Sequence, residues 1–85
     1  MKAFEYTIKD ELGIHARPAG LLVKEAKKYE SRICIIKEGK AAEATKLMAL
    51  MPLAVKCGQT IQVEVEGSDE DVACEGMKHF LESNL

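Results

Sequence analysis

Ile61-Gln62-Val63-Glu64-Val65-Glu66 is the stretch of this 85-residue sequence that decides the fold. Its apolar and polar side chains alternate strictly, which is the period of a β-strand with one buried and one solvated face. Gly67 and Ser68 follow, and then apolar residues at helical spacing between positions 72 and 81. Ser68 is a preferred N-cap residue, and the acidic residues after it favour the positive end of a helix. The pattern therefore predicts a half-buried strand, a turn and a closing amphipathic helix.

The rest of the chain also alternates between strand and helix patterns. Residues 4–9, 32–37 and 40–43 have strand patterns, the last being the weakest because alanine has low strand propensity. Helical spacing covers residues 16–29, and a short helix is predicted from Thr45 to Met51, ended by Pro52. The order β-α-β-β-α-β-α predicts an α+β sandwich with helices on one face of a single sheet. Gly76 inside the last helix indicates close packing there.

Length and composition limit the classes of function. Residues 1–85 are expected to form a single domain. The net charge is −2, whereas nucleic-acid binding usually needs a strongly basic face. The chain has two tyrosines, two phenylalanines and no tryptophan, so it also has few side chains on which bases could stack. Both features argue against a nucleic-acid partner. Cys34, Cys57 and Cys74 are expected to be free thiols, Cys57 the exposed one, and no metal-ligand spacing occurs. The sequence predicts neither a signal peptide nor membrane insertion, so the expected location is the cytoplasm.

Candidate chemistry concentrates in Gly13-Ile14-His15-Ala16-Arg17-Pro18-Ala19. Proline is tolerated in a first helical turn, where N–H groups lack intrahelical partners. Those N–H groups and the positive end of the helix dipole form a phosphate site. Arg17 adds a planar, positively charged guanidinium group that suits phosphate oxygens. His15 adds an imidazole that is nucleophilic when neutral. A capping or surface histidine is the alternative, but the offsets of Arg17 and Pro18 favour reversible phosphorylation of His15.

This stretch resembles the active-site signature of HPr, the histidine-containing phosphocarrier family of the bacterial phosphoenolpyruvate:sugar phosphotransferase system. The resemblance extends to Gly39-Lys40, Leu47-Met48, Met51 and Leu53, and to the last strand and helix. It implies an open-faced β-sandwich in which three helices cover one face of a four-stranded antiparallel sheet. It also implies that His15 accepts a phosphoryl group from phosphorylated Enzyme I and donates it to IIA domains of sugar permeases. Such a protein is a stoichiometric carrier and not an independent enzyme.

The resemblance also implies roles for neighbouring residues. Arg17 would neutralise the phosphate, and the backbone N–H groups of Ala16 and Arg17 would help to hold it, without a metal or organic cofactor. A partner surface is expected beside His15, and its members are Leu47, Met48, Met51, Lys24, Lys27 and Lys46. Leu50, and in part Leu47, is expected to pack in the core. The resemblance also implies that the protein is a monomer.

Lys46 is the largest departure from the family pattern. Many members carry a serine there that a regulatory kinase phosphorylates, and lysine cannot be that site, so no conventional serine regulation is expected. Thr45 offers an N-cap one residue earlier. Two other interpretations stay open: a regulatory interaction module derived from HPr, and an unrelated ferredoxin-like binding domain. The acidic balance and few aromatic residues argue against a nucleic-acid-binding version of the latter.

Overall fold

The computed structural model describes residues 1–14 and 16–85. Along the chain the elements are β1 (Lys2–Thr7), α1 (Ala16–Ala26), β2 (Arg32–Lys37), β3 (Lys40–Glu43), α2 (Leu47–Leu50), η1 (Met51–Leu53), β4 (Thr60–Glu66) and α3 (Glu70–Asn84). η1 is a single 3₁₀ turn that continues α2. Apart from η1, this is the predicted element order.

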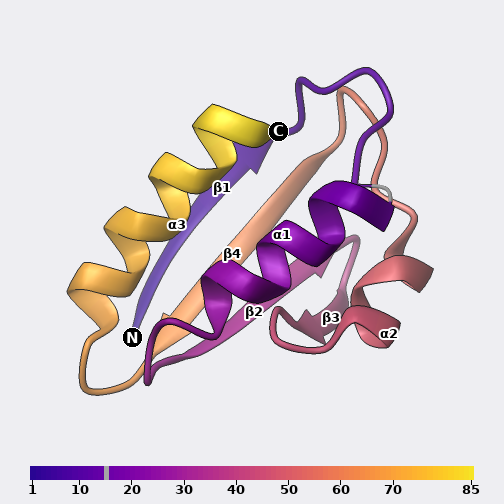
Figure 1. Cartoon of the computed structure of the whole chain (residues 1–85). Helices are drawn as coiled ribbons and strands as arrows, with labels where there is room; N and C mark the ends of the chain where they lie inside the picture. Colours follow the sequence, from indigo (N-terminus) through magenta and orange to yellow (C-terminus); the bar gives the residue numbers. More distant parts are fainter. Residues whose placement is uncertain (15) are drawn as a thin grey trace.

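The four strands form one antiparallel sheet in the order β1-β4-β2-β3. β4 is a central strand, and its alternation buries Ile61, Val63 and Val65 on one face. Figure 1 shows α1 and α3 side by side over the same face of the sheet, with α2 beyond α1. The expected four-stranded antiparallel sheet with helices on one face is therefore confirmed.

Helices and sheet meet in one apolar core. α1 contributes Ala19, Leu22 and Ala26, which are fully buried, and α3 contributes Met77 and Leu81. Burial of a leucine or methionine side chain stabilises the folded state by about 1.5–3 kcal/mol. The free thiols lie as expected, with Cys57 exposed, Cys34 half-buried and Cys74 buried.

Gly76 allows α3 to pass over the side chain of Tyr29. A Cβ atom at Gly76 would lie 2.8 Å from Tyr29 Cζ and closer still to its hydroxyl oxygen. The Tyr29 hydroxyl donates to Glu25 Oε2 at 2.9 Å. The predicted close packing at this glycine is confirmed.

α1 and α2 have boundaries that differ from the predicted ones. α1 ends at Ala26 and not at Tyr29, which is half-buried in the turn after the helix. α2 begins at Leu47, and its N-cap residue is Lys46, so Thr45 does not cap it. Pro52 does not force Met51 out of helical geometry, because Met51 has φ −57° and ψ −44°. Pro52 instead occupies the 3₁₀ turn, where its missing N–H needs no partner.

Asp69, and not Ser68, is the N-cap residue of α3. Ser68 Oγ donates to Glu30 Oε2 at 3.0 Å instead. The Asp69 carboxylate accepts hydrogen bonds from the Glu30 N–H at 2.9 Å, the Ser31 N–H at 2.8 Å and the Ser31 hydroxyl. These bonds, that of the Ser31 hydroxyl above all, lower the pKa of the Asp69 carboxyl. This side chain therefore fastens the connection between α1 and β2.

Candidate functional site

The loop between β1 and α1 leads to position 15. Asp10 Oδ1 accepts from the Leu12 N–H at 2.9 Å, and the Gly13 N–H donates to the Asp10 carbonyl at 3.0 Å. The Ile14 N–H donates to the Val55 carbonyl at 2.9 Å, which ties the loop to the segment after η1. His15 lies outside the described residues, so its role stays a prediction.

Gly13 permits close approach of this loop to the backbone of residues 55 and 56. Its φ of +69° belongs to the left-handed region, which glycine enters without a Cβ clash. A Cβ atom would also lie 2.7 Å from Lys56 Cα and nearer still to the Val55 carbonyl oxygen. On the other side, the Leu85 carbonyl accepts from the Lys9 and Asp10 N–H groups at 2.6 and 2.8 Å. Backbone contacts thus hold the loop from two directions.

α1 begins at Ala16, the residue that follows His15 in the sequence. The first-turn N–H groups of a helix have no intrahelical acceptor, and here no acidic side chain in that turn offsets the positive end of the dipole. Pro18 is buried, whereas Arg17 is exposed. The start of α1 therefore offers an anion both backbone donors and a guanidinium.

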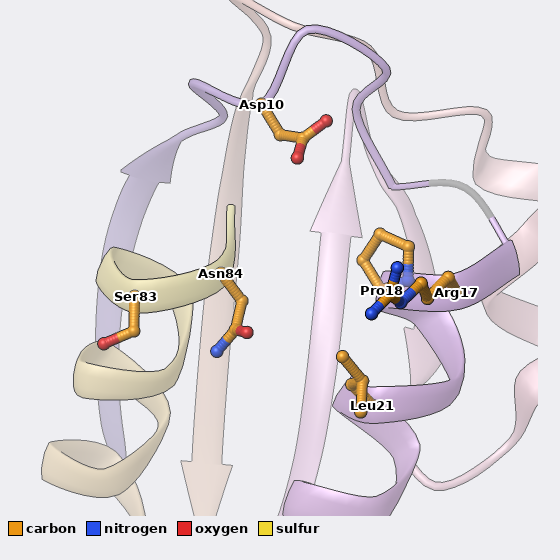
Figure 2. A pocket seen from close by; sticks show the side chains of 6 residues that line it. All are labelled: Asp10, Arg17, Pro18, Leu21, Ser83 and Asn84. Carbon is orange, nitrogen blue, oxygen red and sulfur yellow. The ribbon is translucent and has the colours of Figure 1, made fainter.

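Arg17 lines an open pocket of about 290 Å³ between α1 and the end of α3. Its other lining residues are Asp10, Pro18, Leu21, Ser83 and Asn84. Figure 2 shows the Asp10 side chain on the loop above this space, with Arg17 on α1 across from the end of α3. Sequence reasoning missed Asp10, Ser83 and Asn84 as neighbours of Arg17, because nothing local in the sequence indicates that α3 ends there.

The apolar residues of the predicted partner surface are exposed on α2 and η1. Met48 is 83% exposed, Leu47 40% and Met51 38%, whereas Leu50 is 2% exposed and belongs to the core as predicted. We call Leu47, Met48 and Met51 the α2 apolar cluster. α2 packs beside α1 at the same end of the molecule as the start of that helix. The cluster therefore lies at the end of the molecule that carries Arg17.

The three predicted surface lysines lie in different surroundings. Lys24, Lys27 and Lys46 are all exposed. Lys24 borders a hollow between α1 and α3, so it lies on the α3 side of α1 and the structure does not bring it to the α2 apolar cluster. Lys46 Nζ lies 3.5 Å from Glu43 Oε2, and exposed pairs of this kind contribute little to stability. A role for these lysines in partner binding stays a prediction.

Comparison with known families decides which family this chain represents. A family model described as "PTS HPr component phosphorylation site" matches residues 2–83. The chain belongs to the HPr family. The phosphocarrier protein HPr of Mycoplasma capricolum is 40% identical over 81 residues, which cover 95% of this chain and 91% of that protein. The HPr-like protein Crh of Halalkalibacterium halodurans is 44% identical over 75 residues, covering 88% and 89%.

Solved HPr structures have the same fold. The crystal structure of HPr-C-His from Thermoanaerobacter tengcongensis has a TM-score of 0.94 and 37% identity, and the match covers 99% of this chain and 94% of that one. The resemblance to the phosphocarrier family of the phosphotransferase system is therefore confirmed, and so is the open-faced sandwich. Among the residues that the structure describes, no helix is long and apolar enough to cross a membrane.

Proposed function

We propose that residues 1–85 act as a single HPr domain that carries a phosphoryl group on His15 from phosphorylated Enzyme I to IIA domains of sugar permeases. The match of residues 2–83 to the family model of the HPr phosphorylation site carries this proposal. It is supported by Arg17, which is exposed in the first turn of α1 two residues after His15. The protein acts as a stoichiometric carrier within the phosphotransferase system.

Transfer to this carrier needs a nucleophile and a cradle for negative charge. A neutral imidazole nitrogen of His15 attacks the phosphorus atom while the bond from phosphorus to the Enzyme I donor atom breaks, and its electron pair leaves with that atom. The guanidinium of Arg17 and the backbone N–H groups of Ala16 and Arg17 offset the charge on the phosphoryl oxygens. Donation to a IIA domain repeats the step with His15 as the leaving group. These steps use no metal or organic cofactor.

The α2 apolar cluster serves as the docking surface for both partners. Methionine side chains are flexible, so one surface can repack against different proteins. Exposed Lys24, Lys27 and Lys46 attract acidic partners to the molecule by their positive charge. Lys46 directly precedes the cluster in the chain, whereas Lys24 acts from the α3 side of α1. The carrier works as a cytoplasmic monomer.

Lys46 removes the conventional serine regulation in this proposal. Its ammonium has the opposite charge to a phosphoserine and lies beside Glu43. Incubation with ATP and the regulatory kinase is expected to leave the intact mass unchanged. Stoichiometric phosphate on Thr45 would contradict this part of the proposal.

The carrier function is tested by phosphoryl transfer from phosphoenolpyruvate through Enzyme I. Intact mass under neutral conditions is expected to show one acid-labile phosphate on the wild type and none on His15→Ala. The control is an Enzyme I preparation that phosphorylates another HPr. A wild type that stays unphosphorylated by that preparation would overturn the carrier function.

A regulatory interaction module is the second candidate, because the HPr-like protein Crh is among the relatives. In that case the chain would bind regulatory partners without relaying phosphate. His15 and Arg17 favour the carrier, since a pure binding module needs neither a nucleophile nor an anion site. The transfer experiment separates the two functions.

A further inference from the structure

Lys37 is the last residue of β2, and its side chain reaches the segment that follows α2. Its Nζ donates to the Leu53 carbonyl at 2.9 Å and to the Ala54 carbonyl at 3.0 Å. Lys37 is half-buried, whereas Lys40, its partner in the β2–β3 register, is exposed. The ammonium therefore satisfies carbonyl groups at the end of η1, as lysine side chains do at helix C-termini.

Ala54 has a backbone conformation that needs support. Its φ of 51° and ψ of 47° are left-handed, a region in which a Cβ atom is crowded and glycine is not. The Ala54 N–H donates to the Met51 carbonyl at 3.1 Å, which closes the 3₁₀ turn. The Lys37 ammonium thus binds the carbonyls on both sides of a strained alanine.

Ala54 joins two segments that the proposed function uses. The α2 apolar cluster lies just before it in the chain. Val55 comes directly after it, is buried and accepts the N–H of Ile14 from the loop that leads to position 15. A relaxation of the backbone at Ala54 would therefore change how the cluster is placed relative to that loop.

We infer that Lys37 is a positioning residue for partner docking, which holds the α2–η1 segment in the conformation that presents the α2 apolar cluster. This inference rests on the proposed function. Without the ammonium, the segment samples other conformations, and apparent partner affinity falls with the population of the competent one. The loop before position 15 keeps its internal hydrogen bonds to Asp10 and its hydrogen bonds to the Leu85 carbonyl, so the chemical step is little affected.

The direct test removes the ammonium and follows hydrogen exchange in the unphosphorylated protein. Exchange of the Ala54 N–H is expected to become about tenfold faster in Lys37→Met, because both hydrogen bonds from the ammonium to the Leu53 and Ala54 carbonyls are lost. Lys40→Met is the matched control, since it removes the same charge from the same hairpin, and is expected to exchange like the wild type. Adding Ala54→Gly to Lys37→Met is expected to slow exchange again, because glycine adopts this turn without strain.

Transfer from Enzyme I then distinguishes positioning from a purely structural role. In Lys37→Met, the KM for phosphorylated Enzyme I is expected to rise about fivefold while kcat stays within about twofold. Lys37→Arg is expected to retain the wild-type KM. Equal exchange in Lys37→Met and Lys40→Met, or faster exchange with an unchanged KM, would overturn the inference. If Lys37→Met does not fold, Lys37→Met/Ala54→Gly is compared with Ala54→Gly alone by the same criteria. A wild type that takes no phosphate contradicts the proposed function, whereas the exchange comparison still decides whether Lys37 holds the segment.

Discussion

Replacement of Gly13 by alanine is expected to destabilise the protein far more than the same replacement at Gly58. Both glycines have left-handed backbones, with φ of 69° and 87°, so both changes cost about 1–2 kcal/mol in backbone strain. Their surroundings differ. A Cβ atom at Gly13 would press against the Val55 carbonyl and lie 2.7 Å from Lys56 Cα, whereas nothing lies within 4 Å of one at Gly58.

The contact at Gly13 involves backbone atoms, so no change of side-chain rotamer relieves it. Overpacking of this kind costs about 1–3 kcal/mol, which brings the expected loss for Gly13→Ala to about 2–5 kcal/mol. For a chain of this length, 1 kcal/mol changes Tm by about 4–8 °C. Gly13→Ala is therefore expected to lower Tm by about 8–40 °C, and Gly58→Ala by about 4–16 °C, with the larger loss in Gly13→Ala.

Urea unfolding measures both losses of unfolding free energy. Circular dichroism is a suitable probe of unfolding, because the chain has no tryptophan for fluorescence. The free energies of unfolding of the two variants are compared with that of the wild type. Losses that agree within about 0.5 kcal/mol would refute the argument, because backbone strain alone would then explain both.

Three further predictions follow from the exposed side chains and from Asp69. Arg17→Met is expected to slow single-turnover phosphoryl transfer about a hundredfold with an unchanged Tm, because an exposed side chain that stabilises developing charge is lost; an unchanged rate would exclude that role. Met48→Ala is expected to raise KM for Enzyme I about fivefold, whereas Val72→Ala, which changes a 66% exposed residue on α3, leaves it unaltered; equal values would remove Met48 from the docking surface. Hydrogen bonds from Ser31 and Glu30 lower the pKa of the Asp69 carboxyl below its unfolded value, so its stabilisation is present at neutral pH and is lost as pH falls through the folded pKa. Urea midpoints below about pH 4 should therefore fall more steeply in the wild type than in Asp69→Ala, and parallel profiles would contradict this.

Local periodicity predicted most of the secondary structure correctly. Residues 61–66 belong to β4, one of the two inner strands, and Leu50 is buried while Met48 is exposed, as their positions in the pattern indicate. The errors lie at element ends, where tertiary contacts compete with local preference. The Asp69 carboxylate accepts from Ser31 in the loop between α1 and β2, so as the N-cap residue of α3 it leaves its own helix without a side-chain cap.

The sequence by itself determined the strands, the helices and the placing of Arg17 two residues after His15, because alternation and short offsets are local properties of a chain. Only the tertiary structure decided which distant groups meet. In the folded chain, Asp10 and Asn84 line the pocket beside Arg17. Gly13 packs against the backbone of Val55, and the Lys37 ammonium donates to the Ala54 carbonyl. These contacts depend on the strand order β1-β4-β2-β3 and on how the loops cross the sheet ends. Pairwise contacts between remote residues have no periodic signature, so they arise only once the whole chain has packed.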